Sequence, residues 1–393
     1  MTSPLNGIRV LDLTQIYQGP YATFLMAQAG AQVIKIEPPE GERLRPHPKA
    51  KPSLAFATLN SNKLSVSANL KTEQGKGLFL ELVRSADMVV ENYGPGAMER
   101  LGLGWKRLQA ENDQLIYVSG TGFGLSGPDH DLLAMDHTIQ AASGLMGATG
   151  GPEDPPTRAG GAPSDFMGGI HMYAGAVTAL LGRNQTGHGT HVEVSMLEAM
   201  YFNLTTELAA LFATGSNPDK HRHRSPSTVV PYSVFRCRDG RYVAVICIME
   251  RHWQTLAQVM GQPELADDAR FSRKTRFDNE AQLNALIEAW TATLDQEQVF
   301  TELREAKIPV APVRTIEDVY GNTHMLARGS LQSMEHPEAG PMMLPGSPIR
   351  YSEFDAPELA FFPELGSANR IIYGDLLGYG EDQLAALLAS GAI

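Results

Sequence analysis

The sequence predicts an α/β protein of two domains, the larger of which contains a mostly parallel β-sheet. The 393 residues exceed the usual size of a single domain. Short apolar stretches typical of strands alternate with helical stretches between residues 8 and 195, as they do in βαβ units. The composition then changes near residue 217, where a polar and basic stretch begins.

Four strand-like stretches open the chain, at residues 8–13, 32–37, 88–91 and 115–119. Helical patterns alternate with them at residues 21–29, 72–84 and 96–101. Gly30 ends the first helical pattern, and Pro38 and Pro39 end the second strand, because glycine and proline interrupt regular structure.

Residues 120–164 are rich in Gly, Pro, Ala and Ser, and we expect loops that line a site there. A helix over 166–183 follows, and its many small residues permit close packing at a cost of about 1 kcal/mol for each glycine. A strand at 191–195 and a helix at 196–215 complete the pattern of this part of the chain.

The stretch 217–227 contains His221, Arg222, His223 and Arg224 in succession and is typical of a linker. Beyond it a smaller α/β unit is predicted up to about residue 320, with strands at 233–236 and 242–248 and helices at 250–260 and 279–294. The remaining chain is proline-rich and ends in a helix at 381–389.

The bulk composition excludes several classes of protein. A hydrophobic content of 43% predicts a large core, and a net charge of −12 argues against general binding of nucleic acid or anionic membrane. Cys237 and Cys247 do not have the spacing of a metal site or a disulfide framework, and we expect two buried thiols in a reducing compartment. Neither a secretory signal nor a membrane-spanning stretch is evident, so we expect a cytoplasmic protein.

Common catalytic and cofactor motifs are missing or weak. The turn after the first strand has one glycine where a dinucleotide fingerprint has three, and Gly122, Gly124 and Gly127 are followed by Pro128 rather than by a helix. The sequence contains no G-x-S-x-G, S-x-x-K, C-x-x-C or H-E-x-x-H motif. These observations argue against a nicotinamide enzyme, a serine hydrolase and a metal enzyme.

Asp165 is the strongest candidate for a catalytic side chain. It follows Ala159-Gly160-Gly161-Ala162-Pro163-Ser164 and opens the predicted 166–183 helix. A carboxylate there is usually an N-cap. The same position suits a nucleophile, because a helix start favours the ionised form and offers free N–H groups to an oxyanion. Gly168 and Gly169 are expected to let a substrate approach the backbone closely.

Five segments together make the chain similar to the family III CoA-transferases, the family that includes formyl-CoA transferase and carnitine CoA-transferase. The segments are residues 7–45 (GIRVLDLTQIYQGPYATF…), 69–105 (NLKTEQGKG…VVENYGPGAMERLGLGW), 120–128 (GTGFGLSGP), 158–200 (RAGGAPSDFMGGIHMYAG…) and 335–352 (EHPEAGPMMLPGSPIRYS). The resemblance covers nearly the whole chain, and it places the family's catalytic aspartate on Asp165.

The resemblance also implies a set of residues that bind coenzyme A, which are Tyr17, Gln18, Asn69, Leu70, Lys71, Asn92, Tyr93, Arg100 and Asp136. Lys71 and Arg100 are expected to pair with phosphates, and Tyr93 to cover adenine or pantetheine. Some relatives carry arginine where this chain has Pro38, so the corresponding phosphate contact is absent or comes from Arg43 or Arg45.

The fold implied by the resemblance is an interlocked homodimer. Each subunit has a Rossmann-like, CoA-binding large domain built from both ends of the chain, here 1–217 and 326–393, and a small α/β domain with its linker at 218–325. Coenzyme A is a substrate, and no metal or other cofactor is expected. The partners are an acyl-CoA and a small carboxylic acid, without nucleic acid or membrane.

The implied reaction transfers CoA through an aspartyl anhydride and an aspartyl-CoA thioester. One alternative is α-methylacyl-CoA racemase, which belongs to the same superfamily and needs two bases. Met135 stands where such racemases carry histidine, and His137 would have to substitute. A second alternative is a CoA-binding protein without catalytic activity.

Overall fold

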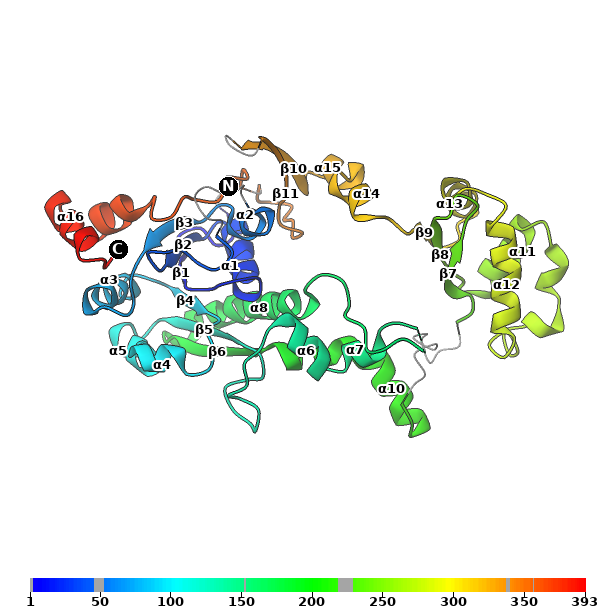
Figure 1. Cartoon of the computed structure of the whole chain (residues 1–393), viewed down its shortest axis with the longest axis horizontal. Coiled ribbons are helices and arrows are strands. Elements are labelled where there is room, and N and C mark those ends of the chain that lie inside the picture. Colours follow the sequence, from blue (N-terminus) through cyan, green and yellow to red (C-terminus); the bar gives the residue numbers. More distant parts are fainter. Residues whose placement is uncertain (1–2, 46–52, 152, 218–228, 337–339, 356) are drawn as a thin grey trace. The chain divides into compact units, whose positions relative to one another are not determined.

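The computed structural model describes residues 3–45, 53–151, 153–217, 229–336, 340–355 and 357–393. It divides into two compact units (Figure 1). The first unit contains residues 1–150, 154–205 and 322–393, and the second contains residues 151–153 and 206–321. The linker predicted at 217–227 lies almost entirely outside the described residues.

A six-stranded parallel sheet forms the centre of the first unit, in the order β3-β2-β1-β4-β5-β6. Its strands are β1 (Arg9–Asp12), β2 (Gln32–Glu37), β3 (Leu64–Ser67), β4 (Met88–Glu91), β5 (Ile116–Thr121) and β6 (Thr190–Ser195). This is the Rossmann strand order, in which the direction of winding reverses between β1 and β4. The predicted α/β class with a parallel sheet is confirmed.

Both faces of this sheet are buried, because alternate residues of each strand point to opposite sides. Val10 packs with residues of α1 (Gln18–Gln28) and α8 (Pro163–Thr186) on one face. Its neighbour Leu11 packs on the other face with α3 (Glu73–Val83) and α5 (Trp105–Glu111). The sheet is therefore the middle layer of three.

Shorter helices connect and cover these layers. They are α2 (Leu54–Asn60), α4 (Ala97–Leu101), α6 (Asp136–Ala142), α7 (Leu145–Ala148), α9 (Met196–Tyr201) and the 3₁₀ turn Phe202–Leu204. The helix expected at 196–215 is thus interrupted by this turn and continues as α10 (Thr205–Thr214), which the contacts group with the second unit.

The C-terminal part of the chain completes the first unit. It comprises α15 (Thr323–Ala327), the hairpin of β10 (Leu331–His336) and β11 (Gly340–Pro345), the π-helix Arg370–Leu376 and α16 (Glu381–Ala389). Tyr373 donates a hydrogen bond to the carbonyl of Ser67 (2.9 Å), and the N–H of Asn69 donates to the carbonyl of Ala392 (2.8 Å). Residues from both ends of the chain therefore share one core.

The second unit has an antiparallel sheet of β7 (Tyr232–Arg236), β8 (Tyr242–Ile246) and β9 (Val310–Pro312). Its helices are α11 (Glu250–Val259), α12 (Glu280–Thr291), α13 (Gln296–Glu305) and α14 (Ile316–Tyr320), with 3₁₀ turns at Pro263–Ala266 and Ala269–Phe271. Trp253 and Phe271 lie at the centre of its core. Cys237 and Cys247 are both free and buried in the same core, as expected.

Candidate active site

A cavity of about 540 Å³ opens at the carboxyl ends of β1 and β4, where the winding of the sheet reverses. Open α/β sheets bind ligands at this kind of position. The turn after β1, the residues at and after the end of β4, and Asp165 line the cavity. Strand β5 contributes Tyr117 and residues 119–121, and the loop after it contributes residues 122–125, His130 and residues 132–135. The glycine-rich loop from residue 120 was expected to line a site, and its first part does so.

Asp165 lies in the cavity wall on the first turn of α8, with 7% of its surface exposed. The helix begins at Pro163 and its N-cap is Ala162, so the prediction that Asp165 opens a helix over 166–183 is wrong by three residues. Proline is favoured at this first helical position because its missing N–H has no partner there in any case. Asp165 is therefore not the N-cap of α8, and the N-cap residue Ala162 makes no side-chain capping hydrogen bond.

Asp136 supports this turn from the start of α6. Its carboxylate accepts hydrogen bonds from the backbone N–H of Ser164 (2.9 Å) and from Nε2 of Gln140 (2.6 Å). Asp136 is buried, with 7% of its surface exposed. It was predicted as a CoA contact, which stays a prediction, and in the structure it holds the residue before Asp165.

Burial, together with the negative charge of Asp136, raises the pKa of Asp165 to about 7. The helix start was expected to keep this carboxylate ionised, whereas a pKa of about 7 leaves it only about half ionised at neutral pH. A helix terminus stabilises a charge by about 0.3–1 kcal/mol, whereas each pKa unit corresponds to about 1.4 kcal/mol, so burial outweighs the helix. Asp165 is consequently poised between its charged and neutral forms near pH 7.

The two glycines after Asp165 serve helix packing rather than substrate approach. A Cβ atom on Gly169 would lie 2.5 Å from the carbonyl oxygen of Gln18, and one on Gly168 would lie 2.8 Å from Nε2 of the same residue. Real Cβ atoms essentially never come this close to another heavy atom. Gly168 and Gly169 thus allow α8 to cross α1 at short range, which corrects the prediction made from the sequence.

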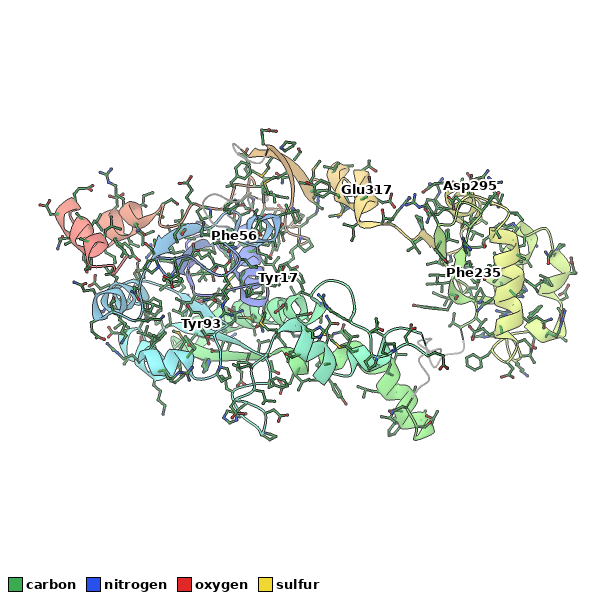
Figure 2. The ribbon with its side chains drawn as sticks, viewed as in Figure 1. Tyr17, Phe56, Tyr93, Phe235, Asp295 and Glu317 are labelled. Atoms are coloured by element: carbon green, nitrogen blue, oxygen red, sulfur yellow. The ribbon has the colours of Figure 1, made fainter. Side chains whose placement is uncertain are left out.

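Three of the predicted CoA-binding residues line the cavity, namely Gln18, Asn92 and Tyr93. Tyr17 lies at the start of α1 with its ring centroid 6.1 Å from that of Phe166, and Figure 2 labels both Tyr17 and Tyr93. The side chain of Asn92 is engaged by the turn after β1, since it accepts from the N–H of Gln15 (2.8 Å) and donates to its carbonyl (2.9 Å).

The predicted segment Asn69, Leu70 and Lys71 lies between β3 and α3 and is not part of the described cavity wall. Asn69 bonds to the C-terminal residues through both its N–H and its side chain. Leu70 packs on the core, and Lys71 is exposed.

The predicted arginines differ in how they are placed. Arg100 is exposed on α4, and its guanidinium donates to the carbonyl of Pro95, a cavity residue (2.9 Å). Arg45 is engaged with the carboxylate of Glu37 (2.6 Å) and lies over the ring of Phe56. Arg43 is exposed and lines the cavity, so of the two proposed replacements for a phosphate contact only Arg43 is available there.

Four further residues of the cavity wall carry polar side chains and were not predicted from the sequence: Glu91, Tyr117, Ser119 and His191. Burial raises the pKa of Glu91 to about 7, although hydrogen bonds from Ser119 and from the N–H of Tyr93 oppose this shift. Ser119 is bonded in turn to Nε2 of His191 (2.9 Å), whose pKa is lowered by burial. Glu91 could have been found as the last residue of its strand, but His191 required the pairing of β5 with β6.

Met135 lines the cavity, whereas His137 is exposed and is not among the described wall residues. Within the parts of the chain that the structure describes, no group of three His, Cys, Asp or Glu side chains is arranged to hold a metal ion. Over the same residues, no helix has both the length and the apolar character needed to cross a bilayer.

Comparison with known proteins assigns the chain to a family. The profile of CoA-transferase family III matches residues 5–369. Formyl-CoA:oxalate CoA-transferase of Streptomyces avermitilis is 35% identical over 413 residues, covering 100% of both chains. Acetyl-CoA:oxalate CoA-transferase of Acetobacter aceti is 37% identical, covering 90% of each chain. A crystal structure of a CAIB/BAIF family protein from Brucella suis superimposes with a TM-score of 0.85 at 30% identity, covering 96% of this chain and 100% of the other.

Proposed function

We propose that Asp165 is the covalent nucleophile of this protein. The chain belongs to CoA-transferase family III and is an acyl-CoA:carboxylate CoA-transferase. The observation that carries this proposal is the position of Asp165, a buried carboxylate on the first turn of α8 in the wall of the switch-point cavity. A nucleophile must meet its substrate in a site from which water can be excluded, and a buried carboxylate at a cavity wall satisfies both requirements.

The proposed reaction has four steps at three carbonyl carbons: that of the donor acyl group, that of the Asp165 side chain and that of the acceptor. The Asp165 carboxylate attacks the thioester, the carbon–sulfur bond breaks, and an anhydride and CoA thiolate result. The thiolate attacks the aspartyl carbonyl, which releases the donor acid and leaves an aspartyl-CoA thioester. The acceptor carboxylate attacks this thioester and releases the thiolate again. The thiolate finally attacks the acceptor side of the new anhydride, which yields the product thioester and regenerates Asp165.

The raised pKa of Asp165 is compatible with this role. A carboxylate that is poorly stabilised by its surroundings is a better nucleophile than a solvated one, and about half of it is ionised near pH 7. Every intermediate conserves the energy of the thioester, so the chemistry requires neither a metal nor a redox cofactor. It does require that water stay away from the anhydride.

We further propose that the acyl-CoA occupies the cavity with its thioester at Asp165. Tyr93 offers an aromatic surface there, and Arg43 and Arg100 are exposed cations at or next to the wall that suit phosphate groups. Because the pKa of Glu91 is raised to about 7, this side chain is partly neutral at pH 7 and adds less negative charge to the cavity wall. Lys71 does not line the cavity, so we propose that it contacts a phosphate group of CoA outside the cavity.

A small dicarboxylate is the acceptor that we propose. The two relatives described above are named for oxalate, and both align with at least 90% of this chain. The test is a panel of acyl-CoA donors, including formyl-CoA and acetyl-CoA, against dicarboxylate, hydroxy-acid and betaine acceptors, with mass spectrometry of the CoA products. We expect new CoA esters of dicarboxylates that depend on the acceptor and are absent with Asp165→Asn. Transfer only to monocarboxylates or betaines would overturn the proposed acceptor.

The racemase alternative is disfavoured by the cavity wall. A racemase needs a base on each face of the α-carbon, and the thioether of Met135 cannot move a proton. Incubation with a 2-methylacyl-CoA in D₂O should therefore introduce little deuterium at the α-carbon. Rapid exchange without transfer of CoA to an acceptor would reverse the assignment and point to His137 and Asp165 as the two bases.

A further inference from the structure

Gln18, the first residue of α1, is a buried amide with an unused donor. Only 3% of its surface is exposed, and its Nε2 has no hydrogen-bond partner among the residues that the structure describes. A buried polar group without a partner costs free energy and therefore calls for an explanation. Gln18 lines the cavity together with Asp165, so a ligand in the cavity is the natural acceptor for this donor.

Two glycines form the slot that holds this amide. A Cβ atom on Gly168 would lie 2.8 Å from Nε2 of Gln18, and a Cβ atom on Gly120 would lie 2.9 Å from its Oε1. A Cβ atom on Gly168 would therefore force the amide to shift, whereas one on Gly120 would meet Sδ of Met172 first, at 2.6 Å. Gly168 follows Asp165 by three residues on α8, so both lie on one face of the helix, about 4.5 Å apart along its axis.

The turn that precedes Gln18 is held in a strained conformation. Ile16 has a φ of 66°, which a β-branched side chain rarely adopts. Asn92 fixes the preceding residue with two hydrogen bonds to the N–H and carbonyl of Gln15, at 2.8 and 2.9 Å. Local strain of this kind persists only where surrounding bonds over-determine the backbone, and it is typical of pre-organised sites.

Resting on the function proposed above, we infer that Gln18 Nε2 donates a hydrogen bond to the carbonyl oxygen of the acyl group formed on Asp165. Thiolate or acceptor attack converts this oxygen into an oxyanion, and a neutral donor fixed beside it stabilises the charge as it develops. Gln18 is then a catalytic residue of the two steps that occur at the aspartyl carbonyl. Asn92 is a positioning residue that acts through the turn.

Gln18→Met tests this inference, because methionine has nearly the same shape but no donor. We expect kcat to fall by about 10²–10³ while KM for the acyl-CoA changes little, as when one oxyanion donor is removed. The unfolding midpoint should not fall, since the lost amide nitrogen has no protein partner. Retention of kcat within about threefold, or a rise in KM alone, would overturn the inference.

Trapping separates this inference from the proposed function. Hydroxylamine added during turnover should modify Asp165 in the wild-type enzyme. If it does not, the covalent mechanism itself fails. If Asp165 is modified in the wild type but Gln18→Met turns over normally, only the role of Gln18 fails.

Gly168→Ala provides a second test, with Gly182→Ala as the matched control. Both residues are on α8, but a Cβ atom on Gly182 meets no other atom within 4 Å. Gly168→Ala should lower kcat by displacing the amide, and the control should not. In a Gln18→Met background, Gly168→Ala should cause no further loss of kcat, because the donor is already gone. An equal loss in both backgrounds would contradict the inference.

Asn92→Ala tests the positioning role in the same way. It should lower kcat in the wild type and leave kcat unchanged in the Gln18→Met background. Asn112→Ala is its control, since Asn112 donates to two backbone carbonyls, those of Val83 and Ala86, and is not among the described wall residues. Additive effects of Asn92→Ala and Gln18→Met would show that Asn92 does not act through Gln18.

Discussion

Two carboxylic acids with similarly raised pKa values share the cavity, and their surroundings distinguish them. Burial raises the pKa of both Asp165 and Glu91 to about 7. Glu91 is stabilised by hydrogen bonds from Ser119 and from the N–H of Tyr93. Among the described residues no such bond stabilises Asp165, and the charge of Asp136 further raises its pKa. Asp165 is the less stabilised of the two when ionised, which suits the nucleophile rather than a structural acid.

This difference predicts the pH dependence of the reaction. Only ionised Asp165 can attack, so kcat/KM should fall about tenfold per pH unit below an apparent pKa near 7. Asp136→Asn removes the neighbouring negative charge and should move this acid limb to lower pH, while its amide oxygen can still accept from Ser164. The measurement is the pH profile of kcat/KM for each variant.

Glu91→Gln is the control for this profile. It removes the other carboxyl group with a pKa near 7 from the cavity wall. We expect its acid limb to match that of the wild type. A limb that moves with Glu91→Gln but not with Asp136→Asn would assign the essential ionisation to Glu91 instead.

Single residues were predicted unevenly from the sequence. Asp165 was proposed because it follows a glycine-rich stretch at a helix start and because the resemblance places the family's catalytic aspartate there. Its pKa could not be predicted, because Asp136 comes from another helix 29 residues earlier and burial depends on the assembled unit. For the same reason Gly168 and Gly169 were assigned to the substrate, whereas their neighbours belong to α1.

At the scale of the elements, a buried ion pair links the start of the edge strand β3 to the end of the central strand β1. Nζ of Lys63, just before β3, donates to Asp12 at the end of β1 (2.9 Å), and both side chains are fully buried. Lys63 also bonds to Thr23 and Asn60. Burial by itself raises the pKa of Asp12, but Lys63 and Lys35 lower it to about 2, so the aspartate is ionised at neutral pH.

Lys63→Met should therefore destabilise the protein by about 3–5 kcal/mol, because it leaves the Asp12 carboxylate buried without its partner. The deficit should shrink as the pH is lowered and Asp12 becomes protonated. Urea unfolding at several pH values measures it. Lys76→Met is the control, since Lys76 pairs with Glu73 at the surface and should contribute less than about 1 kcal/mol. Equal effects of the two substitutions would contradict the role of the buried pair.

Apolar patterns in the sequence predicted some elements with their observed bounds and missed others. The strands at 32–37 and 88–91 and the helix at 381–389 have the expected bounds. The helix α2 and strand β3 were missed; every second residue of β3 is a serine, so β3 lacks the continuous apolar run that identified β4. The hydroxyl of Ser65 donates a hydrogen bond to Glu37, and that of Ser67 accepts one from Asn369. Both partners lie outside β3 in the sequence, so the local pattern could not reveal them.

On the scale of the whole molecule, the first unit is assembled from both ends of the chain. The resemblance to the family leads us to propose that two such chains form an interlocked homodimer.

An interlocked dimer can exchange subunits only by unfolding. Two differently tagged preparations should therefore form no mixed dimers on long incubation at nanomolar concentration, and sedimentation should detect no monomer. Joint denaturation in urea followed by refolding is the positive control and should produce mixed dimers. A stable folded monomer, or mixing under native conditions, would rule out the interlocked arrangement.

The most direct test of the central claim is the identification of the residue that carries the covalent intermediate. The enzyme is incubated with acyl-CoA and acceptor in the presence of hydroxylamine, digested and examined by mass spectrometry, with Asp165→Asn as the control. The account predicts a hydroxamate on Asp165 in the peptide that contains Ser164 and Phe166, and no transfer by the variant. Modification of a different residue, or more than about a tenth of wild-type transfer by Asp165→Asn, would contradict it.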